Sequence, residues 1–158
     1  MKEQIISQAL KFVPLYLNAD MNTGGDSDSV DMQGMKSAAF LLLFGATLAG
    51  DAGIKLFSGA THGSKDNAMT FNYKYGGAAV KSANADVFSA IATSADLTVT
   101  GTTFVSRGLI IEVNADQITD GDRYLTLEVD SDASAGTLGV WAVLDPMFKN
   151  PSGDSVID

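Results

Sequence analysis

Seven consecutive apolar residues, 38–44, constrain the fold of this chain more than any other stretch. The run begins shortly after Gly34 and ends at Gly45, and a segment rich in Asp, Gly and Ser, 18–29, precedes it. An apolar run this short between glycines is typical of a buried strand, because helices usually need ten or more residues. Both faces of such a strand would be apolar, so we expect it to lie at the centre of the core with other strands packed around it.

Six further segments have the length and composition of strands. Turns rich in Gly, Asp, Asn and Ser separate them, and the chain has 16 glycines but only 3 prolines. The clearest segment, AMTFNYKY, alternates Met and aromatic residues with polar ones, which is the period of a half-buried strand. The six segments are 53–58, 68–75, 97–100, 108–113, 124–129 and 137–144. Strands of this number and spacing predict an all-β fold, an antiparallel β-sandwich of jelly-roll type.

The same patterns predict which side chains fill the space between the two sheets. We expect the core to contain the inward residues of the most apolar strands: Phe40, Leu42, Phe44, Leu109, Ile111, Leu125, Leu127, Val140 and Ala142. Trp141 lies within the apolar last strand, so we expect it in the core as well. A shift of one residue would turn every one of these side chains to the opposite face, so their burial tests the register.

The two ends of the chain are predicted to lie outside the sandwich. Residues 1–17 form an N-terminal arm, 18–146 the sandwich, and 147–158 a C-terminal tail. Apolar residues of the arm recur at nearly helical spacing up to Pro14, which would end a helix. The alternative is an extended arm that leads into a strand over 12–17. We expect both ends to contact a neighbouring copy or a partner through Ile5, Ile6, Leu10, Val13, Val156 and Ile157.

Charge and cysteine content exclude several classes of function. The chain has 10 basic and 19 acidic residues, a net charge of −9, and its Lys and Arg residues do not cluster. Because nucleic acids are bound through clustered cations, we expect no nucleic-acid partner. The longest apolar run is too short to cross a bilayer, so we expect no membrane partner either. There is no cysteine, which excludes disulfides and thiolate chemistry and suits synthesis in a reducing cytoplasm.

No combination of residues indicates catalysis. His62 is the only histidine, and the neighbouring sequence supplies neither an orienting partner nor a nucleophile for a general base. Acidic turns offer weak calcium ligands, of which Asp116, Asp120 and Asp122 are the best placed, although Asp is also an ordinary turn former. We therefore predict a protein that is not an enzyme and that has no cofactor and no resident metal.

Three aromatic residues, Phe71, Tyr73 and Tyr75, share one face of the segment 68–75. An exposed row of rings would suit sugar binding, whereas buried rings would close the core, and core packing is the commoner use of such a row. A carbohydrate-binding or adhesin-type β-sandwich module is therefore the alternative function.

Three segments together carry a resemblance to a known family. The first is VDMQG, residues 30–34, between an Asp-, Thr- and Gly-rich approach and an apolar strand that ends in Gly. The second is Arg123-Tyr124-Leu125 at the start of a strand, and the third is the closing apolar strand 140–144 followed by Asp145-Pro146. In this order, over residues 18–147, they resemble the small capsid decoration and minor head proteins of tailed bacteriophages.

The resemblance implies a viral structural protein. A protein of this family would bind the outer surface of a phage head and stabilise it, with the major capsid protein as its partner and the virion exterior as its location. The family also implies a homo-oligomer, with a trimer favoured.

Overall fold

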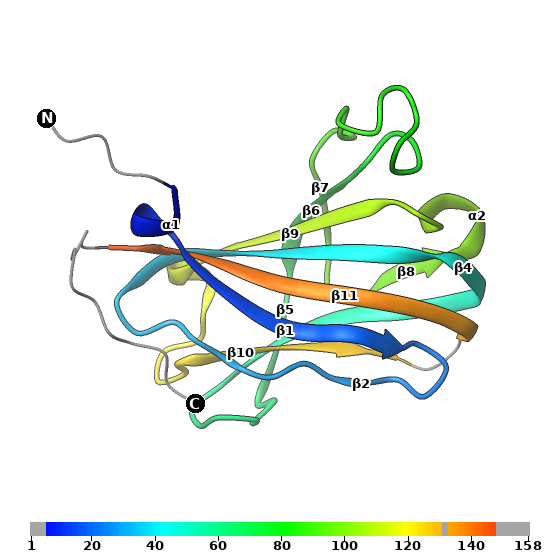
Figure 1. Cartoon of the computed structure of the whole chain (residues 1–158). Helices are drawn as coiled ribbons and strands as arrows, with labels where there is room; N and C mark the ends of the chain where they lie inside the picture. The colour runs from blue at the N-terminus through cyan, green and yellow to red at the C-terminus, as the bar shows by residue number, and fades with distance from the viewer. Residues whose placement is uncertain (1–5, 131–132, 148–158) are drawn as a thin grey trace, which may run out of the picture.

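Two layers of antiparallel strands form the protein, as described by a computed structural model for residues 6–130 and 133–147 (Figure 1). The first layer, sheet A, contains in spatial order β1 (Lys11–Asp20), β11 (Ala133–Pro146), the first part of β4 (Met35–Gly59), β9 (Gly108–Asn114), β6 (Phe71–Tyr75) and β7 (Ala92–Ser94). The second layer, sheet B, contains β2 (Gly25–Asp26), β3 (Val30–Asp31), β10 (Tyr124–Val129), the last part of β4, β5 (Asn67–Met69) and β8 (Leu97–Thr100). The predicted all-β antiparallel fold is confirmed.

The long strand β4 belongs to both layers. Its residues 37–43 pair with β9 and 35–50 pair with β11 in sheet A, whereas 51–54 pair with β8 and 54–59 with β10 in sheet B. Gly50, with φ of +82°, lies where the strand passes from one layer to the other. With Gly50 and Gly53, the sequence of 46–53 is typical of a turn-rich link between strands. Pairing with β11 and β8 instead keeps this segment extended, because each half of the corner has a partner strand.

A short helix, α2 (Gly101–Phe104), packs against this corner. A Cβ atom at Gly101 would lie 2.2 Å from the carbonyl oxygen of Leu48, so only glycine allows the helix to approach β4 this closely. The ring of Phe104 packs edge-on against Phe44 at 5.7 Å between centroids, which closes this end of the core.

The core lies between the two layers, and strand periodicity decides which residues enter it. All nine residues that the sequence predicted there are at most 5% exposed. Along the first part of β4, Phe40 and Leu42 point inward, whereas Leu41 and Leu43 point outward. The register predicted for the sandwich is therefore correct.

Two predictions about the core are wrong for the same reason: that both faces of the run 38–44 are covered, and that Trp141 is buried. Trp141 is 41% exposed and Leu43 is 56% exposed, so the apolar run 38–44 is covered on one face only. Both side chains lie on the outer face of sheet A, over which no other layer of the described chain passes. An apolar residue between two inward-facing neighbours must face outward, whatever its chemistry.

The N-terminal segment is partly helical and partly a strand. Helix α1 spans Ile6–Ala9, and β1 then pairs antiparallel with β11, with Pro14 opposite Trp141. Val13 packs against the core. Residues 11–17 are thus an edge strand of sheet A and not part of an arm outside the sandwich, and the tail 148–158 lies outside the described residues.

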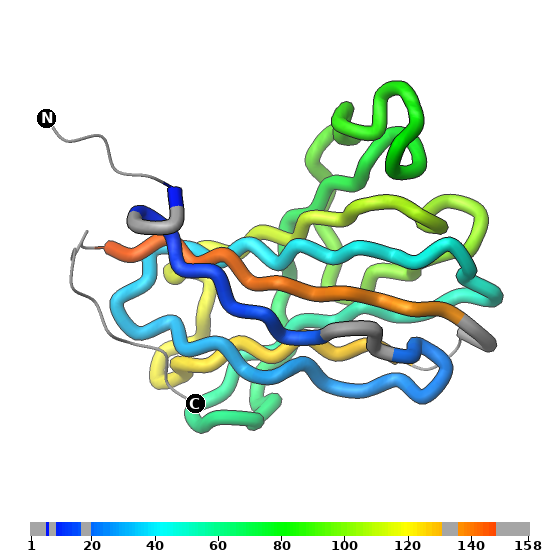
Figure 2. Tube along the Cα trace, in the orientation of Figure 1, coloured from blue at the N-terminus to red at the C-terminus, as the bar shows by residue number. Residues whose placement is uncertain are grey.

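The segment 76–91 projects beyond the sandwich between β6 and β7 (Figures 1 and 2). Its Ala- and Ser-rich sequence would allow a short helical turn near 86–92, but no helix forms there. The segment instead makes a series of tight turns, with φ of +68° at Lys81 and +65° at Asn84. The jelly-roll connectivity remains a prediction.

Candidate interaction surface

The outer face of sheet A forms a continuous apolar surface. We call it the A face and define it by the outward side chains Phe12, Pro14, Leu41, Leu43, Ile110, Trp141 and Val143. Cross-strand register brings these residues together, because Pro14 lies opposite Trp141, Trp141 opposite Leu41, and Leu41 opposite Ile110. Four neighbouring strands thus contribute one apolar row.

Leu43 is more exposed than Phe12 or Trp141 on the A face, and its neighbours explain why. Its partner on β11 is Gly139 and its partner on β9 is Gly108, so neither neighbouring strand supplies a side chain to cover it. A Cβ atom built on Gly139 would meet nothing within 4 Å. A Cβ atom built on Gly108 would lie 3.7 Å from Leu43 Cδ2, so Leu43 covers Gly108 and leaves open space only on the side of Gly139.

Two ion pairs border the A face. Lys74 Nζ lies 3.7 Å from Glu112 Oε1, and Lys36 Nζ lies 4.0 Å from Asp145 Oδ2. Each pair carries one positive and one negative charge. The border is therefore locally neutral in a chain whose net charge is −9.

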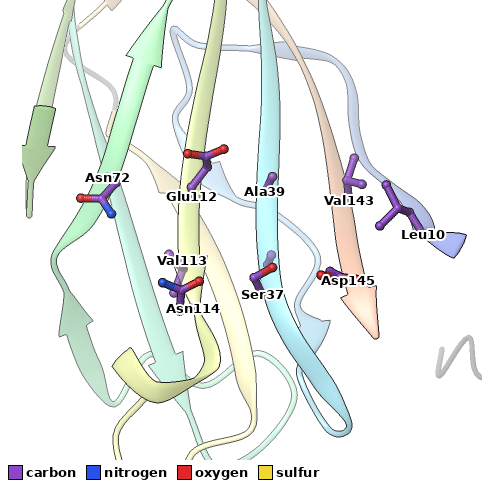
Figure 3. A pocket seen from close by; sticks show the side chains of 10 residues that line it. Leu10, Ser37, Ala39, Asn72, Glu112, Val113, Asn114, Val143 and Asp145 are labelled. Atoms are coloured by element: carbon purple, nitrogen blue, oxygen red, sulfur yellow. The ribbon is translucent and has the colours of Figure 1, made fainter. Parts of the chain in front are cut away.

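A hollow of about 380 Å³ opens beside the A face, at the end where α1 lies (Figure 3). Its floor consists of the small residues Ser37 and Ala39, and Glu112 and Asp145 lie on opposite sides of it. Leu10 adds an apolar wall. The hollow exists because small side chains occupy the central strand, while longer ones occupy the strands on either side.

The projecting segment 76–91, which we call the projecting loop, exposes a second group of apolar side chains. Val80 is 51% exposed, Val87 56%, Phe88 39% and Ile91 66%. The base of the loop is nevertheless held firmly, because Gly77 N donates to the carbonyl oxygen of Val87 at 2.7 Å. These side chains are exposed because the backbone fixes them away from the core.

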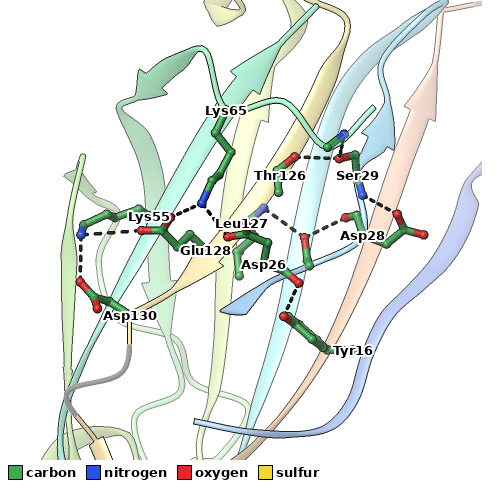
Figure 4. Close-up of polar contacts among 12 residues, drawn as sticks. Tyr16, Asp26, Asp28, Ser29, Lys55, Lys65, Thr126, Leu127, Glu128 and Asp130 are labelled. Carbon is green, nitrogen blue, oxygen red and sulfur yellow. Dashed lines mark hydrogen bonds and ion pairs between the residues drawn. The ribbon is translucent and has the colours of Figure 1, made fainter. Parts of the chain in front are cut away.

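The outer face of sheet B has the opposite character, since ion pairs extend across it (Figure 4). Lys65 Nζ lies 2.9 Å from Asp26 Oδ1 and 2.5 Å from Glu128 Oε2, and Lys55 Nζ lies 3.1 Å from Asp130 Oδ2. The hydrogen bond that Lys65 donates to Glu128, followed by the one that it donates to Asp26, raises the pKa of Lys65 above its usual value. These side chains suit contact with water.

Among the described residues, no exposed large apolar side chain lies on the outer face of sheet B. The exposed large apolar side chains are Ile6, Phe12, Leu43, Val80, Val87, Phe88, Ile91, Trp141 and Met147. They fall into three places: the A face, the projecting loop, and the end of the sandwich where α1 and the end of β11 lie (Figure 1). The two sides of the molecule are thus chemically different.

Two of the motif segments in the sequence meet in space. Arg123 Nε lies 2.7 Å from Asp31 Oδ1, and Arg123 Nη2 also donates to Asp31 Oδ2. Gln33 N donates to Asp31 Oδ1 at 2.9 Å, and Gly34 has φ of +72°, which favours glycine. The Arg123 guanidinium holds the pKa of Asp31 below its usual value of about 3.8. These residues have a structural role, because they fasten the turn between β3 and β4 to the start of β10.

The acidic turn predicted as a weak calcium site does not gather its carboxylates. Within residues 6–130 and 133–147, no three His, Cys, Asp or Glu side chains are placed to hold a metal ion. Asp122 instead accepts hydrogen bonds from Ser58 Oγ at 2.5 Å and Asn67 Nδ2 at 2.9 Å. Asp116, in the 3₁₀ turn Ala115–Gln117, and Asp120 are exposed.

His62 is exposed, and it has a partner that its sequence neighbours do not reveal. Its Nε2 atom lies 2.8 Å from Asp28 Oδ1, and its ring packs edge-on against Tyr124. The contact ties the loop after β4 to the segment between β2 and β3.

The aromatic row of β6 faces inward. Phe71 is fully buried, and Tyr73 and Tyr75 are partly buried against the core. This strand therefore provides no exposed platform for a sugar ring, which the carbohydrate-binding alternative requires.

The contact residues predicted for the two ends of the chain lie in different environments. Ile6 is 68% exposed and Leu10 is half-buried beside the hollow, whereas Val13 packs against the core. Ile5, Val156 and Ile157 lie outside the described residues. The sequence analysis missed the A face, although the outward residues of the run 38–44 were a signal for it.

Comparison with protein-family models, curated proteins and solved structures gave no match for this chain. No helix among the described residues is long and apolar enough to span a bilayer.

Proposed function

We propose that this chain is a viral structural protein, a decoration protein that binds the outer surface of a phage head and stabilises it. Its partner is the major capsid protein, its location is the virion exterior, and it acts there as a homo-oligomer, with a trimer favoured. The motif resemblance supplies the family, and the distribution of exposed apolar side chains supports a role in assembly.

The observation that carries the proposal is the chemical difference between the two sides of the sandwich. Soluble monomers rarely expose contiguous apolar patches larger than a few hundred Å², and larger patches mark contact sites. Here the exposed apolar groups occupy the A face, the projecting loop and one end, whereas sheet B presents ion pairs. A protein that binds a phage head needs apolar surfaces for contact with its neighbours and a charged surface, such as that of sheet B, for contact with water.

The end of the sandwich that carries α1 is the region we assign to the head. Ile6 is 68% exposed and Met147 is 55% exposed, and α1 lies near the end of β11 (Figure 1). Leu10, which follows α1, and Asp145, near the end of β11, line the hollow. Apolar side chains around a recess are a common form of protein contact site, in which a central apolar group excludes water.

Binding to heads tests the proposal. Heads assembled from the major capsid protein encoded in the same genome would be mixed with the purified protein and sedimented. We expect the protein to pellet with the heads in a saturable ratio and to raise the temperature at which they break. Ile6→Glu should weaken binding, because it places a charge in the apolar contact.

The matched control is Thr98→Glu, which adds the same charge at an exposed position of β8 in sheet B. It should bind heads as the unchanged protein does. If the unchanged protein never pellets with heads, the proposed function is wrong. If Ile6→Glu pellets as well as the unchanged protein does, the contact assigned to the α1 end is wrong.

A further inference from the structure

We propose that two copies of this chain associate head to tail, with the projecting loop of one copy seated on the A face of the next. The inference rests on the proposed homo-oligomer and deepens it, because it names the two surfaces through which copies would associate, and it can be tested without heads. Its starting point is that one chain carries two separate exposed apolar features, one projecting and one nearly flat. Within one molecule the projecting loop does not cover the A face, and both remain exposed (Figures 1 and 2).

The projecting loop is ready to bind because its backbone is already ordered. Val80 N donates to the carbonyl oxygen of Ser106 at 2.7 Å, and Ser89 N donates to that of Tyr75 at 2.9 Å. Arg107 Nη1 donates to the carbonyl oxygen of Gly76 at 3.2 Å. A loop that is ordered before binding loses little conformational entropy on docking.

The shape of the A face favours a projecting element over a second flat face. Leu43 stands beside open space above Gly139, and the hollow above Ser37 lies further along the same sheet. Two A faces stacked on each other would leave these spaces unfilled. Interface cores reach the packing density of protein interiors, and the side chains of a loop can enter spaces that a flat sheet would cover.

Charge favours a second copy of the same chain as the occupant. The chain carries −9, so copies repel each other over most of their surfaces. The projecting loop has one positive residue, Lys81, and one negative residue, Asp86, and the ion pairs at the border of the A face also sum to zero. A contact between the loop and the A face therefore joins two locally neutral surfaces, where repulsion is smallest.

A contact of this kind uses two different surfaces of each copy. Such head-to-tail contacts close into rings when the rotation between copies permits, and a ring of three is one such closure. An isologous dimer, by contrast, would pair the same surface from both copies and leave the projecting loops bare.

Sedimentation velocity over a range of protein concentrations tests the contact. The unchanged protein should self-associate, and the emission of Trp141, the only tryptophan and a member of the A face, should shift to shorter wavelength as association proceeds. Leu43→Glu on the A face and Ile91→Glu on the loop should each weaken association by about 30-fold or more. Both residues are more than half exposed, so the variants should fold. Thr98→Glu on sheet B is the control and should associate normally.

Mixing the two weakened variants separates head-to-tail from face-to-face association. The Leu43→Glu copy retains a normal loop, and the Ile91→Glu copy retains a normal A face, so the mixture should form a dimer and nothing larger. If Ile91→Glu alone associates normally, or the mixture stays monomeric, the proposal is wrong. A strict monomer of the unchanged protein at every concentration also overturns it. Binding to heads, measured separately with the same samples, would then keep the proposed role as a decoration protein without self-association in solution.

Discussion

Leu42 and Leu43 are adjacent residues of identical type that the fold places on opposite faces of β4, which makes them a sensitive test of the structure. Leu42 is 1% exposed between the layers, and Leu43 is 56% exposed on the A face. Replacing each by Ala removes the same atoms from the same strand. Any difference between the two variants therefore reports the environment of the side chain and not its chemistry.

The expected magnitudes follow from these environments. Leu42→Ala removes a fully buried side chain and leaves a cavity, which costs about 2–5 kcal/mol of unfolding free energy. Leu43 keeps less than half of its surface buried, so Leu43→Ala should cost about 1 kcal/mol or less. In a chain of this size, each kcal/mol lowers the melting temperature by about 2–4 °C.

Urea unfolding followed by circular dichroism measures both changes. The midpoint should fall strongly for Leu42→Ala and slightly for Leu43→Ala, with an unchanged slope for both. Dilute protein, shown to be monomeric by sedimentation, keeps association from contributing to the result. Equal losses, or a larger loss for Leu43→Ala, would refute the assignment of inward and outward residues along β4.

Three further outcomes are expected. In the folded protein Arg123 lowers the pKa of Asp31. This pair therefore stabilises the fold at pH values above about 3.8, the usual pKa of Asp, and its contribution is lost as the pH falls through the lower pKa of the folded state. Asp31→Asn should lower the melting temperature at pH 7, and the difference from the unchanged protein should disappear in acid. Gly59→Ala should destabilise, as urea unfolding will show, because its Cβ atom would lie 2.4 Å from the carbonyl oxygen of Ser64. Gly139→Val should stabilise by a few tenths of a kcal/mol to about 1 kcal/mol, because its Cβ atom meets open space in a strand and Val suits strands better than Gly does; a lower urea midpoint would contradict this.

Much of the fold was predictable because its signals are local. Alternation within 124–129 predicted β10 with the bounds that the structure has, Tyr124–Val129. The apolar run 38–44 and the segment 108–113 likewise predicted strands and their inward residues. A period of two is a property of the backbone of a single strand, so it requires no knowledge of the partners of that strand.

The functional surface was less predictable, because exposure depends on what covers a face. The residues of 38–44 divide into two faces by alternation alone, but only the complete arrangement of layers leaves Leu41, Leu43 and Trp141 uncovered. A strand that is apolar on both sides looks the same in the sequence whether one or two layers cover it. The outward residues of 38–44 and Trp141 were therefore interpreted as core.

Long-range pairings required the tertiary structure. Asp31 and Arg123 are 92 residues apart and His62 and Asp28 are 34 apart, and no local pattern links them. The continuity of β4 through 46–53 also depended on distant partners, β11 and β8, which hold a Gly-containing segment extended. Sequence alone thus determined which residues share a face of a strand. The packing of the two layers decided which faces are covered and which distant charges meet, because burial and ion pairing are properties of the assembled sheets and not of any one segment.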